Sequence, residues 1–345
     1  MEIALTGLCR RKRTMLRVAV PPAYTHPSHY AVRDLVAELT AQGAVPQPIP
    51  VSRRIGRVLA KGHIALPSPL RRRRGPVLVP LMGARFAELY GAALTGDVVP
   101  YCWDVWEPQW RKYVQRLRPL RPRVVFVTAA QSAQFLAGAL PDSKVVHLPE
   151  ATRMSWFTAR RPLADRSIGV LELGRRFEVW HEAVREAVRV RGCHRHIYTS
   201  WSDQLVFPDE RALRDGLSDT VVSVCFPSSI THPRRSGQVE TMTHRYLESI
   251  ASGCLVVGHA PSELVELIGY NPVVEVDWSA PADQLLDILA APEKWQSHVD
   301  NALRRMREVG DWSERVRRIR ETLEANGFGA TLSGGTVRTA VGRAR

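Results

Sequence analysis

Cysteine and long apolar runs are both scarce in this sequence of 345 residues, and each scarcity excludes a class of protein. The five cysteines, an odd number without a Cys-x-x-Cys pair, indicate neither a disulfide framework nor a zinc site. No segment approaches the roughly 18 consecutive apolar residues of a membrane-spanning helix. A basic cluster at residues 10–13 follows a short apolar stretch, the reverse of the order in a secretory signal. We therefore expect a cytoplasmic protein with reduced, buried cysteines.

The net charge of +14 is concentrated in the first half of the chain. Residues 1–150 hold 22 Lys/Arg against 9 Asp/Glu, whereas residues 151–345 hold 26 against 25. A field of one sign favours an anionic partner, such as a phosphorylated lipid, a membrane surface or nucleic acid. The excess of 43 arginines over 5 lysines offers a second explanation, a composition bias on a solvated surface. Both explanations stay open from the sequence.

Short β-rich apolar runs alternate with longer helical patterns, which predicts parallel sheets in an α/β fold. Strands are predicted at residues 16–20, 77–81, 98–101, 124–128 and 145–148, and then at 168–173, 196–199, 220–224, 255–258 and 273–276. Helices are predicted at residues 30–42, 177–190, 241–252, 262–268, 282–290, 293–309 and 312–325. The basic segment 51–74, which contains Pro67 and Pro69, is predicted to be a mobile insertion or a surface helix.

A polar, proline-containing connector near residues 149–167 divides this pattern into two halves. We predict two α/β domains, residues 1–160 and 161–326, that face each other across a cleft. The Gly-, Thr- and Arg-rich residues 327–345 are expected to be disordered. In open parallel sheets a ligand binds beyond the carboxyl ends of the strands, so we look for function in the loops that follow them.

The most informative segment covers residues 239–258. A carboxylate, Glu240, leads into a predicted helix that carries a second carboxylate, Glu248, and stops at Gly253 before a β run. Eight helical positions rise about 12 Å, so these two carboxylates could grip two ends of an elongated ligand. The backbone amides that open the helix could receive a phosphate. They belong to Met242, Thr243 and His244. Plain helix charges on the protein surface are the alternative explanation of both glutamates.

This segment resembles the Glu-x7-Glu signature of retaining GT-B glycosyltransferases of the large "group 1", or family 4, type. Residues 248–257, Glu-Ser-Ile-Ala-Ser-Gly-Cys-Leu-Val-Val, resemble that family's Glu-Ala-x-Ala-x-Gly-x-Pro-Val-Val. Residues 245–253 are also similar to bacterial glycosyltransferases related to spore-coat maturation proteins. Residues 259–264, His-Ala-Pro-Ser-Glu-Leu, stand where the family has a Gly-x-Pro-Glu loop. The resemblance covers roughly residues 168–290 and implies two Rossmann-like domains in the GT-B arrangement.

The resemblance also implies roles for the matched residues. Glu248 should hydrogen-bond the ribose hydroxyls of a nucleotide. Glu240 should lie beside the donor sugar and steady the positive charge that develops at the anomeric carbon. Arg175 or Arg176, which follow the first strand of the second half, should neutralise the leaving diphosphate. Because the lysine that the family has nearby is missing, one of these arginines would act alone or with Arg245.

In the first half, the loop after the strand at 98–101 would face the donor sugar and the acceptor in a GT-B arrangement. Asp104 is therefore a candidate polar contact or catalytic base, and Trp103 and Trp106 could stack on sugar faces. Two core tryptophans and a helix-capping aspartate are the alternative. A histidine after the first strand, His26 or His29, could serve as a base in an inverting enzyme, but retention does not require one.

Together these features predict a hexosyltransferase that moves a sugar from a nucleotide-diphosphate donor to a glycan, lipid-linked or other acceptor, with retention, in polysaccharide biosynthesis. The first domain would bind the acceptor and the second the donor. The basic half would attach peripherally to the anionic inner face of the membrane. No metal is expected, because His181, His194 and His196 lack metal-ligand spacing and a carboxylate partner.

Two alternatives stay open. A nucleotide-sugar epimerase could use the same fold, although no clear acid and base pair for it is visible in the sequence. A non-enzymatic nucleic-acid-binding protein would use the basic half, but helix-turn-helix, zinc-finger and RNA-recognition signatures are absent, so we expect no nucleic-acid partner.

Overall fold

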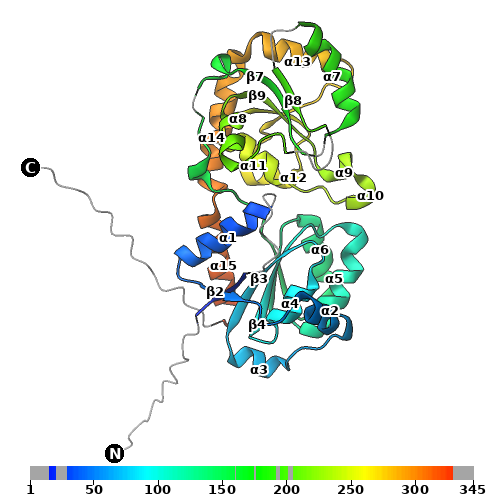
Figure 1. Ribbon diagram of the computed structural model, residues 1–345, viewed down its shortest axis with the longest axis vertical. Coiled ribbons are helices and arrows are strands. Elements are labelled where there is room, and N and C mark those ends of the chain that lie inside the picture. Colours follow the sequence, from blue (N-terminus) through cyan, green and yellow to red (C-terminus); the bar gives the residue numbers. More distant parts are fainter. Residues whose placement is uncertain are drawn as a thin grey trace, which may run out of the picture.

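The computed structural model describes residues 15–20, 29–159, 161–174, 176–191, 195–200 and 205–328. Two open sheets, in which every strand pair is parallel, lie one beyond the other with helices packed around them (Figure 1). This is the α/β architecture that the alternating pattern predicts. His26, Arg175, His194 and residues 329–345 lie outside the described residues. No described helix is long and apolar enough to cross a membrane.

The first sheet has the strand order β2-β1-β3-β4-β5-β6. Its strands are β1 (Arg17–Val20), β2 (Val45–Pro48), β3 (Pro76–Met82), β4 (Asp97–Trp103), β5 (Val124–Val127) and β6 (Lys144–His147). The central strands β3 and β4 are buried almost throughout, which explains their nearly continuous apolar sequences. The edge strand β2 is absent from the predicted set because its sequence, Val-Pro-Gln-Pro, contains two prolines, which sheets tolerate at an edge.

The helices of this half are α1 (Tyr30–Ala41), α2 (Arg53–Gly62), α3 (Ser68–Arg73), α4 (Phe86–Ala92), α5 (Trp110–Leu117) and α6 (Ala130–Ala139). The basic segment 51–74 thus forms two surface helices. Helix α2 packs against α4, and Gly56 is essential to this contact, since a Cβ there would lie 2.4 Å from the carbonyl oxygen of Ala87. The exposed face of α2 carries four of the eight basic side chains of the segment.

The second sheet has the strand order β11-β10-β9-β7-β8. Its strands are β7 (Ile168–Glu172), β8 (Arg195–Tyr198), β9 (Thr220–Cys225), β10 (Leu255–Gly258) and β11 (Val273–Glu275), and each lies where a strand is predicted. The helices that accompany it are α7 (Glu178–Arg191), α8 (Glu210–Ser218), α9 (Ser228–Thr231), α10 (Pro233–Ser236), α11 (His244–Ala251), α12 (Ser262–Ile268), α13 (Pro281–Ala290) and α14 (Gln296–Val309). Short 3-10 turns occur at Glu107–Gln109, Arg118–Leu120, Met154–Trp156, Leu163–Asp165 and Pro292–Trp295.

The start of helix α11 differs from the prediction. The helix begins at His244 rather than at residue 241, with Thr243 as its N-cap residue. Glu263 causes the delay, because its Oε1 atom accepts hydrogen bonds from the Thr241 hydroxyl, at 2.6 Å, and from the Met242 amide. These two residues are therefore held in an extended approach to the helix.

The last helix, α15 (Trp312–Ala325), does not close the second domain as predicted, and it packs on the first instead (Figure 1). Its apolar face joins the core formed by β1, α1 and the strands of the first sheet; the helix contributes Trp312, Val316, Ile319 and Leu323. Phe328 is buried in the same core, so the prediction of disorder is wrong for the first residues of the tail. The helical pattern shows that a face is apolar but does not show which sheet it covers.

Replacing Trp312 by alanine should lower the free energy of unfolding by about 3–5 kcal/mol, the usual cost of removing a buried tryptophan. Trp312 is 1% exposed, whereas Trp278, which is 53% exposed, offers a matched control. Trp278→Ala should cost less than about 1 kcal/mol. Urea unfolding followed by circular dichroism measures both, and equal losses would contradict the position of α15 in the core.

Candidate functional site

A cleft of about 810 Å³ opens between the two sheets. Its walls come from the loops that follow β3, β4 and β5 in the first half, and from the loops that follow β7, β8 and β9 in the second. The start of α1 and the N-terminal end of α11 complete it. The cleft thus lies beyond the carboxyl ends of both sets of parallel strands, where open α/β sheets bind ligands.

Helix α11 aims its N-terminal end at this cleft, and Thr243, His244, Arg245 and Glu248 all line it. The first amides of a helix have no partners within the helix, and the helix dipole adds a partial positive charge there. Such an end is a binding site for an anion. The predicted amide of Met242 is not free for this purpose, because it is bonded to Glu263.

Glu248 is 1% exposed and lies in the floor of the cleft. Its Oε1 atom accepts a hydrogen bond from the hydroxyl of Tyr30, at the start of α1 in the opposite half. Its Oε2 atom lies 3.1 Å from Nη1 of Arg245, one helical turn away. Burial raises the pKa of Glu248 to about 8. Glu248, the residue predicted to bind the ribose, therefore lines the cleft with its side chain buried.

Arg245 is partly buried beside the loop that follows β7, with its side chain 26% exposed. Its Nη2 atom would lie 3.8 Å from a Cβ built on Gly174, a residue whose φ of +76° favours glycine. Burial lowers the pKa of Arg245, and its Nε atom has no hydrogen-bond partner within the described residues. Glu248 is the ion-pair partner of this guanidinium, and an anion in the cleft would stabilise its charge further. Arg245, the glycine loop and the end of α11 therefore converge on one place where a phosphate would fit.

His244 is a neutral member of this group. Burial lowers its pKa to about 3, and its ring packs edge-on against Tyr30 with the centroids 4.7 Å apart. Its Nδ1 atom lies 3.5 Å from Oε2 of Glu150, and neither ring nitrogen has a hydrogen-bond partner within the described residues. Both ring nitrogens are buried, so the imidazole contributes to the packing between Tyr30 and the start of α11.

Arg176 lines the cleft, but it is already engaged. Its guanidinium makes bonds of 2.7–3.0 Å to the Glu178 carboxylate and one of 3.2 Å to the Thr199 carbonyl oxygen. Its charge is therefore largely neutralised in this conformation. Arg175, the other predicted phosphate ligand of this loop, lies outside the described residues.

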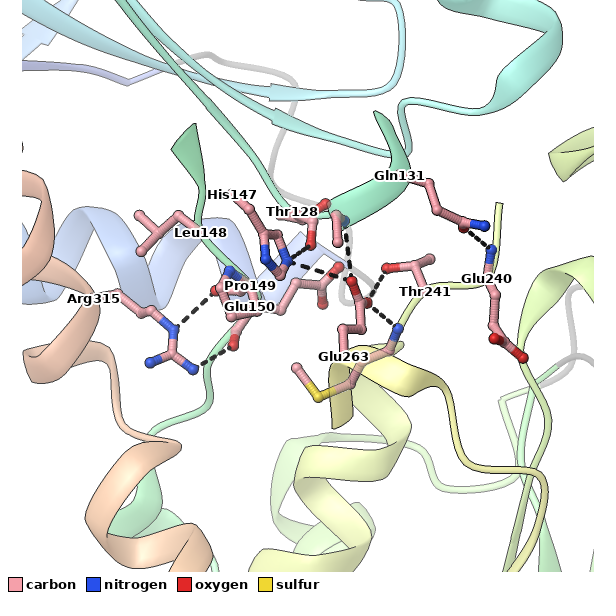
Figure 2. Close-up of polar contacts among 12 residues, drawn as sticks. Thr128, Gln131, His147, Leu148, Pro149, Glu150, Glu240, Thr241, Glu263 and Arg315 are labelled. Atoms are coloured by element: carbon pink, nitrogen blue, oxygen red, sulfur yellow. Dashed lines mark hydrogen bonds and ion pairs between the residues drawn. The ribbon is translucent and has the colours of Figure 1, made fainter. Parts of the chain in front are cut away.

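Glu240 does not line the cleft in this structure. Its carboxylate lies 2.7 Å from Nε2 of His259, whose Nδ1 contacts Glu275 at 2.9 Å. Burial alone would lower the pKa of His259, but these two carboxylates raise it. Figure 2 shows the Glu240 side chain extending away from Glu263, with its amide bonded to Gln131. Glu240 precedes helix α11, as predicted, and its carboxylate contacts His259 instead of lining the cleft with Glu248.

Asp104 is placed at the cleft by the end of β4. Its φ of +54° is unusual for a residue other than glycine, a backbone strain that often occurs at functional sites. Trp103 is a core residue instead: it packs 4.1 Å from the ring of Tyr101 and does not line the cleft, so the sugar-stacking role is wrong for it. Trp106 reaches the cleft wall but is only 2% exposed.

Glu263 is the site residue that the sequence did not single out (Figure 2). It is 3% exposed and holds residues 241 and 242 through Oε1. Its Oε2 atom accepts from the amide of Ala130, at the start of α6 in the first half, at 3.2 Å, and lies 3.4 Å from His147. It therefore joins the approach to α11 to the opposite domain. The position of this residue just inside a helix start, after the Pro261 that follows β10, was the available signal.

Solved structures of other proteins share the architecture of two parallel α/β sheets. No protein-family model and no curated protein matches the sequence. Among solved structures, a sucrose-phosphate synthase from Thermosynechococcus elongatus aligns at a TM-score of 0.58 with 14% identity, covering 91% of this chain and 99% of that one. Anabaena HepE in complex with UDP aligns at 0.56 with 13% identity, covering 90% and 100%. A Listeria monocytogenes protein, named provisionally as a UDP-N-acetylglucosamine 2-epimerase, aligns at 0.53 with 11% identity, covering 91% and 96%.

At such identities the likeness shows the fold. The chain is an α/β protein with two Rossmann-like domains, and its particular arrangement is the GT-B fold that the Glu-x7-Glu resemblance implied.

The raised pKa of Glu248 makes a pH-dependent contribution to stability. The folded chain holds a proton on this carboxyl to a higher pH than the unfolded chain does. The stability of the wild type relative to Glu248→Gln should therefore fall between about pH 5 and pH 8, by up to about 1.4 kcal/mol per pH unit. Above that range the difference should stay constant. Urea unfolding of both chains across this range measures the difference. The exposed Glu266→Gln is the control and should show no such trend; a constant wild-type advantage would refute the shift.

Proposed function

We propose that this protein is a glycosyltransferase that transfers a sugar from a nucleotide-diphosphate donor. One observation carries the proposal: the N-terminal end of α11 faces an interdomain cleft with a buried carboxylate, Glu248, and a partly buried cation, Arg245, on its first turns. Ribose hydroxyls and a diphosphate need these complementary groups. The solved complexes of Anabaena HepE with UDP and with UDP-glucose support the proposal, because that protein has the same fold.

In this proposal each group has one task. Glu248 accepts from the ribose hydroxyls. Arg245 and the amides of α11 bind the diphosphate and stabilise the charge that grows on it as the glycosidic bond breaks. Because these groups supply positive charge at the leaving diphosphate, we expect transfer without a metal ion at that position. Asp104 and Glu240 remain predicted contributors at the reacting sugar, the first from the cleft wall and the second from the loop before Thr241.

The finer features of the proposal come from the sequence resemblance. They are a hexosyl donor, retention at the anomeric carbon, membership of the family 4 group with its spore-maturation relatives, and a role in polysaccharide biosynthesis with a glycan or lipid-linked acceptor. Anomeric analysis of the product by NMR tests retention directly.

A thermal-shift screen against UDP-, GDP- and TDP-sugars should identify the donor, since ligand at 100 times its dissociation constant adds about 2.7 kcal/mol. Calorimetry then compares the nucleoside with its diphosphate. Glu248→Ala should lower the affinity for the nucleoside and for its diphosphate by about 10- to 100-fold. Arg245→Ala should lower only the affinity for the diphosphate, by about the same factor, because charged hydrogen bonds contribute about 1.5–3 kcal/mol. The exposed Glu266→Ala should bind like the wild type.

Undiminished binding by Glu248→Ala would refute the proposed site. Product analysis with the donor alone separates the alternative reaction, because an epimerase converts the sugar without an acceptor, whereas a transferase leaves it on the nucleotide or releases it by hydrolysis. Asp104→Asn and Glu240→Gln should lower turnover while leaving the affinity for the nucleotide diphosphate unchanged.

We also propose that the first domain attaches to an anionic lipid surface through α2. This helix exposes two apolar side chains, Ile55 at 52% and Val58 at 64%, among basic ones. Beside it lies a hollow of about 170 Å³ whose described lining contains no acidic residue. Its six cations are Arg53, Arg57, Lys61, Arg85, Lys112 and Arg116. Basic residues around exposed apolar side chains fit a membrane interface, and the hollow fits a lipid phosphate.

Replacing both Arg53 and Arg57 by glutamate should weaken binding to vesicles of phosphatidylcholine with phosphatidylglycerol by at least about 30-fold, at about 1 kcal/mol per cation. Sedimentation of the full chain with vesicles measures this at low and at high salt. Arg304→Glu with Arg307→Glu, on α14 of the other domain, is the matched control. Equal binding by the two double variants, or equal binding to pure phosphatidylcholine, would count against the proposed surface.

A further inference from the structure

A buried cluster of two histidines and a glutamate lies in the second domain, outside the cleft lining. Glu172 ends β7, His181 lies on α7, and His196 lies on the adjacent strand β8. The Oε1 atom of Glu172 is 2.6 Å from Nδ1 of His181 and 2.7 Å from Nε2 of His196. The three side chains are 2%, 2% and 9% exposed. The fold thus supplies the carboxylate partner that these histidines lack in the sequence pattern.

The hydrogen bonds of this cluster leave part of the carboxylate unsatisfied. Glu172 Oε2 is buried and has no partner within the described residues, a deficiency that costs about 1–3 kcal/mol. Among the described residues its ion-pair partners are these two histidines, and no lysine or arginine reaches it. A buried anion therefore lacks a permanent cation.

We propose that Glu172, His181 and His196 bind a divalent transition-metal cation, for which Zn²⁺ is the best match. Two imidazole nitrogens and a carboxylate oxygen are zinc ligands, with a water completing four-coordination. The three ligand atoms already lie within 4.8 Å of one another. Tetrahedral bonds of 2.0–2.1 Å place ligand atoms about 3.3 Å apart, so the carboxylate needs to retreat by less than about 1 Å. Each neutral imidazole then moves its proton to its other nitrogen.

The cation would act as a support for the cleft rather than as part of the reaction. The carbonyl oxygen of Glu172 accepts from the Thr199 amide at 3.0 Å, and the Thr199 hydroxyl accepts from the Gly174 amide at 2.9 Å. The carbonyl oxygen of Thr199 also holds Arg176. A metal that joins β7, α7 and β8 would therefore hold in place the loop after β7 that contains Gly174. The inference does not depend on which ligand the cleft binds.

The test uses the full chain without a histidine tag, since such a tag would bind zinc itself. After treatment with a chelator, ZnCl₂ is titrated against a competing zinc indicator, and the melting temperature is recorded with and without one equivalent. We expect one tight site per chain and a higher melting temperature. His181→Gln and His196→Gln should each lower the zinc affinity by more than about 100-fold, because loss of a residue that only contacts a metal ligand already lowers metal affinity by about 10- to 100-fold. His298→Gln, which removes a histidine bonded to a carbonyl oxygen elsewhere in this domain, should bind like the wild type.

Circular dichroism and gel filtration show whether each variant folds. A second measurement does not rely on variants: Co²⁺ bound to the wild-type chain should give the visible ligand-field bands of a tetrahedral site, and added Zn²⁺ should abolish them. Absence of a stoichiometric site in the wild type, or identical zinc binding by His298→Gln and His196→Gln, would overturn the proposal and leave the cluster as a hydrogen-bonded structural element.

Discussion

One buried carboxylate, that of Glu263, holds the two sides of the cleft in register. Two of its bonds fix the approach to α11, and a third satisfies the first amide of α6 in the opposite domain. A charge that is 3% exposed is tolerated only when its lone pairs are used, and here donors from both domains use them. The carboxylate also sits in the first turn of α12, where the helix dipole stabilises it. The direction of α11, and with it the positions of Arg245 and Glu248, follows from this contact.

Much of the fold could be predicted because the strands of a parallel sheet that is covered on both faces have nearly continuous apolar sequences. Each predicted strand coincides with an observed one, while β2 escaped because two prolines conceal an edge strand. The start of helix α11 was predicted three residues too early, because the local sequence does not indicate the hydrogen bond from the Met242 amide to Glu263, 21 positions later. Helix α15 was assigned to the wrong domain for a similar reason: an apolar stripe does not specify the surface that it covers.

The candidate site was predictable where its residues are neighbours on one helix. Arg245 and Glu248 share a helical face, so the sequence brings them together. Contacts between distant residues were not accessible in this way. Tyr30 meets Glu248 from 218 positions away, and the partner of His181 and His196 is a glutamate on another strand. Glu240 was expected beside the donor sugar because the resemblance implied it, and no local pattern indicates its contact with His259, 19 positions later.

The return of α15 to the first sheet also constrains the order of synthesis. The core around β1 and α1 contains Trp312, Leu323 and Phe328, so it lacks one side of its packing until residue 328 has left the ribosome. The second sheet, by contrast, closes with strands and helices that all precede residue 310. Although domains commonly fold in the order in which they are made, here the domain that is synthesised first can complete its packing only after the domain that follows it.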